Sequence, residues 1–224
     1  PTCYCSSCDE CESKLNDPNC VIVKLTQSVS SSSGSCIRFY ASDKTLDCQG
    51  FNVSAPERAI DTYYQDNLVV KNCNLVNSGS GLEIYGTDNS TFENINISGC
   101  NVGVHITGSQ VAIINVTVGD AYPTKISFSD YQGDVQIKGV ESPPSDPSGK
   151  HNISKYIEIS GPTWLFLNIT YSDQDITNND VNESTLKIWK HNSSGWFESG
   201  WNGTRILDTA NNIVGVNITS FSTF

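Results

Sequence analysis

The stretch that decides the fold runs from residue 67 to residue 131, and it divides into three similar units. The units read NLVVKNCNLVNSGSGLEIYGTD from Asn67, NSTFENINISGCNVGVHITGS from Asn89 and QVAIINVTVGDAYPTKISFSDY from Gln110. Their lengths are 22, 21 and 22 residues, and their apolar residues lack helical spacing. A repeat of this length is typical of a parallel β-solenoid, in which each unit forms one coil that packs on its neighbours.

Apolar residues recur at the same positions of successive units, which predicts that they stack from coil to coil. The first column contains Val70, Phe92, Ile113 and Val135. The second column contains Leu75, Ile97, Val118 and Val140. The third column contains Ile60, Leu82, Val104 and Ile126, followed two residues later by Thr62, Ile84, Ile106 and Phe128. Residues two apart lie on the same face of a strand.

Asparagines form a further column between the first two apolar columns, at Asn72, Asn94 and Asn115. We predict that they face inward and hydrogen-bond from coil to coil at the strand spacing of ~4.8 Å. Their expected role is structural.

Charge excludes several classes of partner. The chain has 224 residues, with 24 acidic and 13 basic side chains and a formal net charge of −11. Nucleic acid and anionic lipid require a basic patch, so neither is an expected partner. No run of apolar residues is long enough to span a membrane. The chain begins at Pro1 and has no Met, so we expect that a leader has been removed.

Cysteines and glycosylation sequons predict an extracellular location. Nine cysteines are candidates for disulfides, namely Cys3, Cys5, Cys8, Cys11, Cys20, Cys36, Cys48, Cys73 and Cys100. Nine sequons are candidates for N-glycosylation, namely Asn52, Asn89, Asn96, Asn152, Asn168, Asn182, Asn192, Asn202 and Asn217. The tenth sequon, at Asn115, is not a candidate, because it belongs to the asparagine column that we predict to face inward.

Residues 1–20 read as a cysteine-rich cap that covers the open end of the solenoid. The segment CDECESKLN predicts a short helix, capped by Asp9 or a neighbouring residue. The close cysteine spacing also allows a metal site, although disulfides are favoured outside the cell and we expect no metal. Cys36–Cys48 and Cys73–Cys100 are two possible pairings. Because nine is odd, one thiol is either free or paired with another chain.

The β-helix is expected over residues 21–140, with about five coils and a partial one. Ile37 and Phe39 match the third column. Leu46 and Phe51 match the first two columns, and Cys48 takes the asparagine position. A proline-rich linker follows at residues 141–150. Residues 151–224 contain about six short strand patterns separated by turn residues, which favours an antiparallel Ig-like β-sandwich with residues 163–171 as its central strand. The predicted fold class is therefore all-β.

Two parts of the chain resemble known families. The N-x-I/V repeats and the segments GLEIYG and VGVHITG resemble NosD-type right-handed parallel β-helix repeats. The start, CDECESKLNDPNCVIVKLTQSV, looks like the first coil of such proteins from archaeal cell surfaces. The segments DVNESTLKIWK and NITSFSTF are similar to the small domain that precedes PGF-type sorting signals of archaeal surface proteins.

The resemblance implies an exported, glycosylated surface protein, without a settled activity. The sorting signal itself is missing, so we expect that the subunit is trimmed or never anchored. The copper link of NosD is not carried over, because the chain has no Met and only 3 His.

The residues that alternate with the third column are expected to face solvent and to stack in ladders. Arg38, Asp61, Glu83 and His105 form one ladder, and Tyr40, Tyr63 and Tyr85 form another. Carboxylates beside tyrosines can bind sugar, so the candidate glycan-binding face comprises Asp61, Tyr63, Glu83, Tyr85 and His105. Asp61 and Glu83 could act as an acid/base pair on a glycan. The alternative is a solvated or subunit-covered face, and we assign no catalytic residue.

One acidic loop is a candidate for calcium. Asp173, Asp175, Asp180 and Glu183 crowd the segment SDQDITNNDVNE, and carboxylate-rich loops can hold Ca²⁺. The alternative is a solvated turn, and no other cofactor is expected.

Three functions remain in order of preference. The first is a structural subunit of a filament, sheath or surface layer, formed as a homopolymer by end-to-end stacking or strand addition. The second is a glycan-binding adhesin. The third is a polysaccharide lyase or hydrolase that uses the same face. We expect a protein that is not an enzyme.

Overall fold

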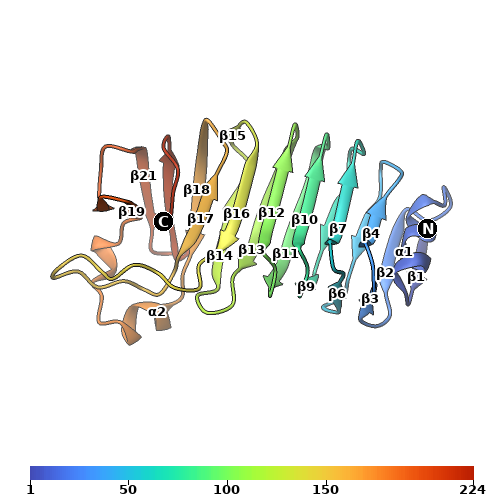
Figure 1. The fold of residues 1–224 in the computed structure, drawn as a ribbon, viewed down its shortest axis with the longest axis horizontal. Helices are drawn as coiled ribbons and strands as arrows, with labels where there is room; N and C mark the ends of the chain where they lie inside the picture. Colours follow the sequence, from blue (N-terminus) through green and yellow to red (C-terminus); the bar gives the residue numbers. More distant parts are fainter.

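The computed structural model of the chain describes residues 1–224 as an elongated rod of stacked strands, with the N-terminus near one end and the last strands at the other (Figure 1). The strands form a 14-stranded sheet, called here the long sheet, a 6-stranded sheet, called the short sheet, and a separate pair. One cluster of 50 buried residues extends from Cys5 to Phe224 and forms a single core.

The parallel part of the long sheet contains one strand from each coil. Its strands are β1 (Thr2–Cys5), β2 (Ile22–Leu25), β5 (Thr45–Asp47), β8 (Val69–Lys71), β11 (Asp88–Ser98) and β13 (Gln110–Val118). Short strands after the bend of each coil extend this sheet, namely β3 (Val29–Ser30), β6 (Asn52–Ser54) and β9 (Asn74–Val76). The solenoid has about five turns.

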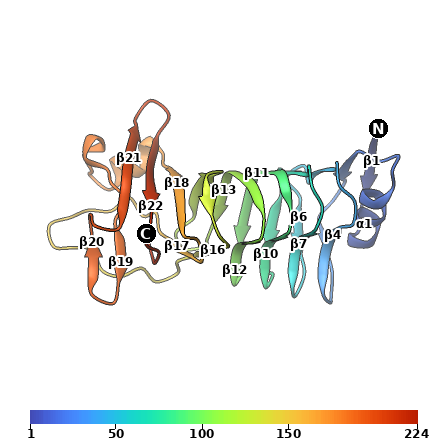
Figure 2. The same ribbon diagram turned by 90° about the horizontal axis from the view of Figure 1, so that it is seen from above.

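The short sheet forms the second face of the rod. Its parallel strands are β4 (Ser35–Phe39), β7 (Arg58–Tyr63), β10 (Ser80–Tyr85) and β12 (Val102–Thr107). Two antiparallel strands, β16 (Val135–Gly139) and β17 (Ile157–Ser160), continue it beyond β12. Figure 2 shows these strands following one another along the rod.

The register confirms the predicted columns within the parallel coils. Phe92 lies between Val70 and Ile113, and Ile97 lies between Leu75 and Val118. On the short sheet, Ile60, Leu82 and Val104 stack in the same way, as do Thr62, Ile84 and Ile106. All of these side chains are buried, because each coil covers the apolar face of the next.

One column assignment in an early coil was wrong. Val53, and not Phe51, pairs with Leu75 in the second column. Gln49 and Gly50 both adopt positive φ, of 52° and 81°, and make the bend before β6 longer than the later ones. The second column therefore begins two residues after the position that a constant repeat predicts.

The prediction of a further parallel coil after Val118 was also wrong, because the chain reverses its direction there. Gly119 (φ 108°) begins a turn that contains Pro123, and β14 (Thr124–Phe128) then runs antiparallel to β13. Ile126 pairs with Val116 and Phe128 pairs with Ile113, so neither continues the third column. Two further predicted members also lie elsewhere: Val135 pairs with Ile106, and Val140 follows the end of β16. The reversal covers the open edge of the last coil.

The asparagine column has a different physical basis from the predicted inward ladder. Asn72, Asn94 and Asn115 adopt left-handed φ values of 56°, 53° and 52°, which asparagine tolerates better than most residues. Asn94 and Asn115 are exposed, and the Asn72 amide donates to Asp47 rather than to another asparagine (3.0 Å). These residues therefore bend the chain between strands.

The asparagine that does hydrogen-bond from coil to coil lies two residues further along each repeat. Asn96 Nδ2 donates to Asn74 Oδ1 at 3.0 Å, and Asn74 Nδ2 donates to the carbonyl oxygen of Gly50 at 2.6 Å. The asparagines that bend the chain are therefore different from the asparagines that hydrogen-bond between coils.

The N-terminal segment forms the predicted short helix, α1 (Cys8–Asn16). Its cap is Ser7, whose side chain accepts from the N–H of Glu10. The carboxylate of Glu12 accepts from the N–H of Arg38 at 2.9 Å and so covers the free edge of β4. This segment closes the first coil.

The disulfides connect Cys3 to Cys20, Cys5 to Cys11, Cys8 to Cys36, and Cys48 to Cys73. Both predicted pairings were wrong, because Cys36 faces α1 and Cys48 lies one coil from Cys73. Cys100 is a free, half-buried thiol. The cluster of N-terminal cysteines is used for disulfides rather than for a metal site.

The C-terminal strands join the solenoid. They are β15 (Tyr131–Gln132), β18 (Trp164–Thr170), β21 (Asn202–Asp208) and β22 (Ile213–Ile218) in the long sheet, and the isolated pair β19 (Lys190–Asn192) and β20 (Gly195–Phe197). The predicted Ig-like sandwich is not confirmed, because β18 pairs with β14 of the solenoid as well as with β22. Two short helices follow β18, namely α2 (Asp173–Asn178) and a 3₁₀ turn, η1 (Glu183–Thr185). No helix has the length and hydrophobicity that a membrane crossing requires.

Candidate functional site

The predicted charged ladder lies on the solvent side of the short sheet, called here the outer face. Arg38 pairs with Asp61, Asp61 with Glu83, and Glu83 with His105, each from one coil to the next. The alternation of β4, β7, β10 and β12 directs these side chains away from the core. The structure therefore brings together the residues that the sequence placed on one face.

Within this ladder, the four side chains form two hydrogen-bonded pairs. Asp61 Oδ2 accepts from Arg38 Nε at 2.8 Å and lies 2.7 Å from Nη2. Arg58 Nη1 approaches the same oxygen at 3.7 Å. Hydrogen bonding to Asp61 is the largest influence that raises the pKa of Arg38. The second pair is Glu83 Oε1 with His105 Nδ1 at 2.8 Å.

Asp61 is only 4% exposed, because Arg38 and its neighbours cover it. A general base must contact the group whose proton it takes, and little of the Asp61 side chain is accessible for such a contact. Asp61 and Glu83 lie on adjacent coils as predicted, and each is hydrogen-bonded to its own partner, Arg38 or His105. The arrangement suits a structural ladder better than an acid/base pair.

Tyrosines form a cluster beside the ladder. The rings of Tyr63 and Tyr85 stack at 5.0 Å with an interplanar angle of 15°. Tyr64 stands edge-on to both rings, at 4.7 Å and 5.2 Å, and its ring lies directly over Gly86. Sequence reasoning missed Tyr64, although its position next to Tyr63 was a signal. Tyr40 and Tyr64 are more than half exposed, so the cluster offers an aromatic surface to solvent.

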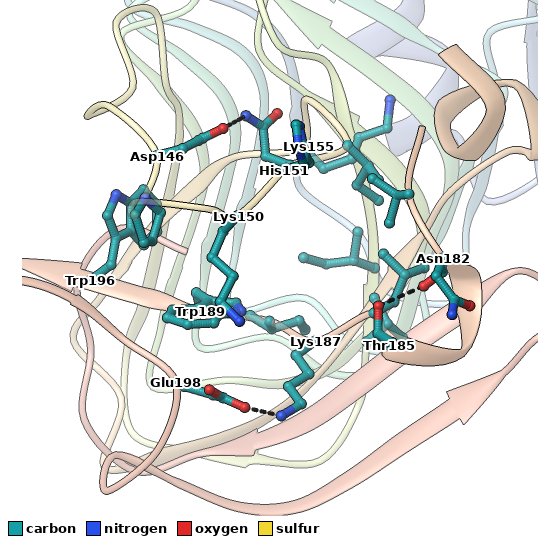
Figure 3. Close-up of a pocket in the computed structure, with 18 of the residues that line it drawn as sticks. Asp146, Lys150, His151, Lys155, Asn182, Thr185, Lys187, Trp189, Trp196 and Glu198 are labelled. Carbon is teal, nitrogen blue, oxygen red and sulfur yellow. Dashed lines mark hydrogen bonds and ion pairs between the residues drawn. The ribbon is translucent and has the colours of Figure 1, made fainter. Parts of the chain in front are cut away.

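A cavity lies elsewhere, among the C-terminal segments, and has a volume of about 660 Å³ (Figure 3). Its walls come from residues 146–156 and 180–189, together with Trp196, Glu198 and Arg205. Sequence reasoning missed this cavity. The available signal was that all tryptophans, together with Lys150 and His151, fall in the last third of the chain.

The candidate calcium loop distributes its carboxylates among separate partners. Asp173 accepts from Asn212, and Asp175 accepts from the N–H of Ser172 as part of a capping box on α2. Glu183 accepts from the hydroxyl of Tyr171, while Asp180 adopts a left-handed φ of 50°. No three His, Cys, Asp or Glu side chains of the structure are grouped as a metal site requires.

The sequons differ in exposure. Asn52, Asn89, Asn96, Asn115 and Asn182 are exposed, so the predicted inward position of Asn115 was wrong. Asn152, Asn168, Asn192, Asn202 and Asn217 are half-buried. The Oδ1 atom of Asn217 is buried without a hydrogen-bond partner.

The two terminal strands of the long sheet have an unpaired edge. β1 pairs only with β2, and β21 pairs only with β22. The two strands lie toward opposite ends of the rod (Figure 1). Exposed edge strands can add a strand from another chain. Tyr4 on β1 and Ile206 on β21 are 57% and 45% exposed.

Comparison with known proteins gives one match. The family model described as right handed beta helix region matches residues 19–142. This range begins before β2 and ends after β16, so it covers the parallel coils other than β1 and the antiparallel strands β14 and β16. No curated protein and no solved structure matches the chain.

Proposed function

The chain belongs to the right-handed β-helix family, and from this premise we propose that it is a structural subunit of an extracellular assembly. The observation that carries the proposal is the pair of open edges, β1 and β21, at opposite ends of one continuous sheet. Contact between β1 of one copy and β21 of the next joins two different surfaces. A contact between two different surfaces produces a filament when successive rotations do not close into a ring, and the filament is the form that we propose.

The covalent structure supports a location outside the cell. Four disulfides hold the N-terminal coils, and three of them join α1 or β1 to their surroundings. Disulfides of this density are typical of oxidising compartments. We extend the proposal to an N-glycosylated surface protein of an archaeal cell, supported by the exposed sequons and by the sequence resemblance.

The test compares two exposed isoleucines. Ile206 lies on the open edge strand β21, whereas Ile114 is 38% exposed on β13, which is paired on both sides. A lysine on an edge strand opposes pairing with another chain. We expect the full chain to form filaments in electron micrographs as its concentration rises. Ile206→Lys should remove them, and Ile114→Lys should keep them.

Two results would contradict this function. One is a wild-type protein that stays monomeric in light scattering at high concentration. The other is filament formation by Ile206→Lys that equals the wild type while circular dichroism shows that both are folded.

A glycan-binding adhesin is the second candidate, and the exposed tyrosine cluster favours it. Carbohydrate rings stack on aromatic side chains, and Tyr40, Tyr63 and Tyr64 are all more than half exposed. A glycan array should then show binding that Tyr64→Ala reduces. Equal binding by this variant, or none by the wild type, excludes the outer face. A lyase or hydrolase on this face would release reducing ends in an Asp61-dependent reaction.

A further inference from the structure

The cavity of about 660 Å³ has the size and composition of a binding site for a small ligand. Its floor is apolar and well packed, with Ile169, Leu186, Ile188, Val214 and Phe224 all less than a tenth exposed. Its rim is polar and includes Asn182, Ser184 and Thr185. A mostly apolar floor beneath a polar rim can hold a ring that carries hydroxyl groups.

Two indole rings form the aromatic wall of the cavity. Trp196 is held in place, because its Nε1 donates to the carbonyl oxygen of Ser145 at 2.8 Å and its ring contacts His191 and Tyr156. Trp189 lies on the same side of the cavity as Trp196, and the ammonium of Lys150 lies 5.6 Å from the ring centroid of Trp189 (Figure 3). Both indoles are half-buried. The wall is therefore rigid on the side of Trp196.

Most of the charged groups around the cavity already have partners. Lys187 forms an ion pair with Glu198, and Lys155 forms one with Asp175 at 3.3 Å. Asp146 accepts from the amide of Asn152 at 2.6 Å and from the hydroxyl of Tyr156 at 3.4 Å. The two ion pairs neutralise Glu198 and Asp175, whereas Asp146 keeps its charge and is held by neutral donors.

Two cations remain without an ion pair, namely Lys150 and Arg205. Each therefore has donors to offer to a ligand, and the guanidinium of Arg205 has the planar geometry that binds carboxylates. Asp180 is the lining carboxylate without a side-chain partner, and it can accept a hydroxyl proton of the same ligand. The chain has a net charge of −11, so two unpaired cations beside two indole rings differ from its acidic character as a whole.

We propose that the cavity bounded by Trp189, Trp196, Lys150 and Arg205 binds an acidic saccharide, with a uronic acid residue inside it. The apolar face of the sugar ring stacks on Trp196. Its carboxylate is bound by Lys150 and Arg205, and its hydroxyl groups contact the polar rim. Lys150 then leaves the ring of Trp189, which opens a second stacking surface. The site includes Arg205 of the edge strand β21, while Trp189, Trp196 and Lys150 lie outside both open edges.

The experiment uses the full chain from a host that does not attach N-glycans, so that the sequons at Asn152 and Asn182 leave the cavity free. Titration calorimetry compares trigalacturonic acid with the neutral galactotriose. We expect the acidic trisaccharide to bind at least about 10-fold more tightly, because its carboxylates make charge-assisted contacts. Its affinity should fall as salt rises, while tryptophan fluorescence changes on binding.

Matched variants test the assignment. Lys150→Gln and Arg205→Gln should each weaken binding of the acidic trisaccharide about 5- to 10-fold, and Trp196→Ala should remove it. The controls are Lys125→Gln, which removes an exposed charge on β14, and Trp164→Ala, which removes an indole outside the cavity; both should bind like the wild type. Thermal unfolding monitored by circular dichroism identifies variants that are misfolded.

Three results would overturn the proposal. The first is no binding of trigalacturonic acid to the folded wild type. The second is equal affinity for the acidic and neutral trisaccharides. The third is wild-type affinity in both Lys150→Gln and Arg205→Gln. Each measurement is made at a concentration at which light scattering shows dispersed monomers, so that its outcome is separate from filament formation.

Discussion

Arg38 and Asp61 occupy the same position on adjacent coils, and the guanidinium of Arg38 covers a carboxylate that is only 4% exposed. The distances from Asp61 Oδ2 are 2.8 Å to Nε and 2.7 Å to Nη2. Two residues that are 23 positions apart in the chain thus form one ion pair because the coil period brings them together.

Arg38→Met should destabilise the protein by about 1–3 kcal/mol, because it leaves a buried carboxylate without its main donor. Asp61→Asn in the same background should recover part of this loss, since it removes the unpaired charge. Urea unfolding of both single variants and the double variant measures the coupling. Additive losses would show that the pair contributes nothing to the stacking of the coils.

Loss of the Cys48–Cys73 disulfide should destabilise the protein by about 3 kcal/mol, because the bond closes a loop of 25 residues in the unfolded chain. The variant is Cys48→Ser with Cys73→Ser. Cys100→Ser is the control and should change stability little, since Cys100 is free and half-buried. Peptide mapping without reduction should find only Cys100 alkylated. A modified Cys36 or Cys73 would contradict the pairing.

Tyr131 should make the protein sensitive to alkaline pH. Burial raises the pKa of Tyr131 from 10.0 to about 12. The unfolded chain therefore loses this proton at lower pH than the folded chain does. The stabilisation is complete below about pH 10 and is lost as pH rises toward 12.

Comparison with Tyr131→Phe isolates this effect. The hydroxyl of Tyr131 accepts from the N–H of Val111 at 3.0 Å and donates to the carbonyl oxygen of Ser109 at 2.9 Å. The free energy of unfolding of the variant should be about 1–2 kcal/mol lower than that of the wild type at neutral pH. Its free energy of unfolding should then fall less steeply than that of the wild type between pH 10 and pH 12. Parallel curves would contradict the assignment.

Asn94 distinguishes the two explanations of the asparagine column. Its φ of 53° predicts that Asn94→Val destabilises the protein by about 1–2 kcal/mol, because β-branched residues are strained in the left-handed region. Asn94→Gly should stay close to the wild type, since glycine adopts this conformation freely. Thermal unfolding of both variants provides the measurement. If the asparagine side chain itself held the coils together, the glycine variant would lose as much stability as the valine variant.

Much of the solenoid was predictable because its information is local and periodic. Phe92 and Ile113 are 21 residues apart in the chain, and this spacing alone indicated that they stack. The outer ladder from Arg38 to His105 follows from the same period and from strand alternation. The short helix at residues 8–16 was likewise visible in its sequence.

The remaining features depend on contacts that no period encodes. The partner of Cys36 is Cys8, because α1 folds over β4 and brings them together. The ion pair between Arg38 and Asp61 depends on side-chain conformation. The sequence alone therefore left Asp61 as a possible acid/base group. The cavity joins residues 146–156 to residues 180–205, and neither segment has a pattern that indicates the other.

The sequence by itself determined that the chain forms a stacked β-rod, which residues face its core, and which charges share its outer face. A repeat carries this information because identical spacing places successive residues at the same height on every coil. Only the tertiary structure decided where the rod ends, how the cysteines pair and where a cavity opens. These features arise where the chain leaves the repeat, and there the packing of distant segments replaces periodicity as the cause of structure.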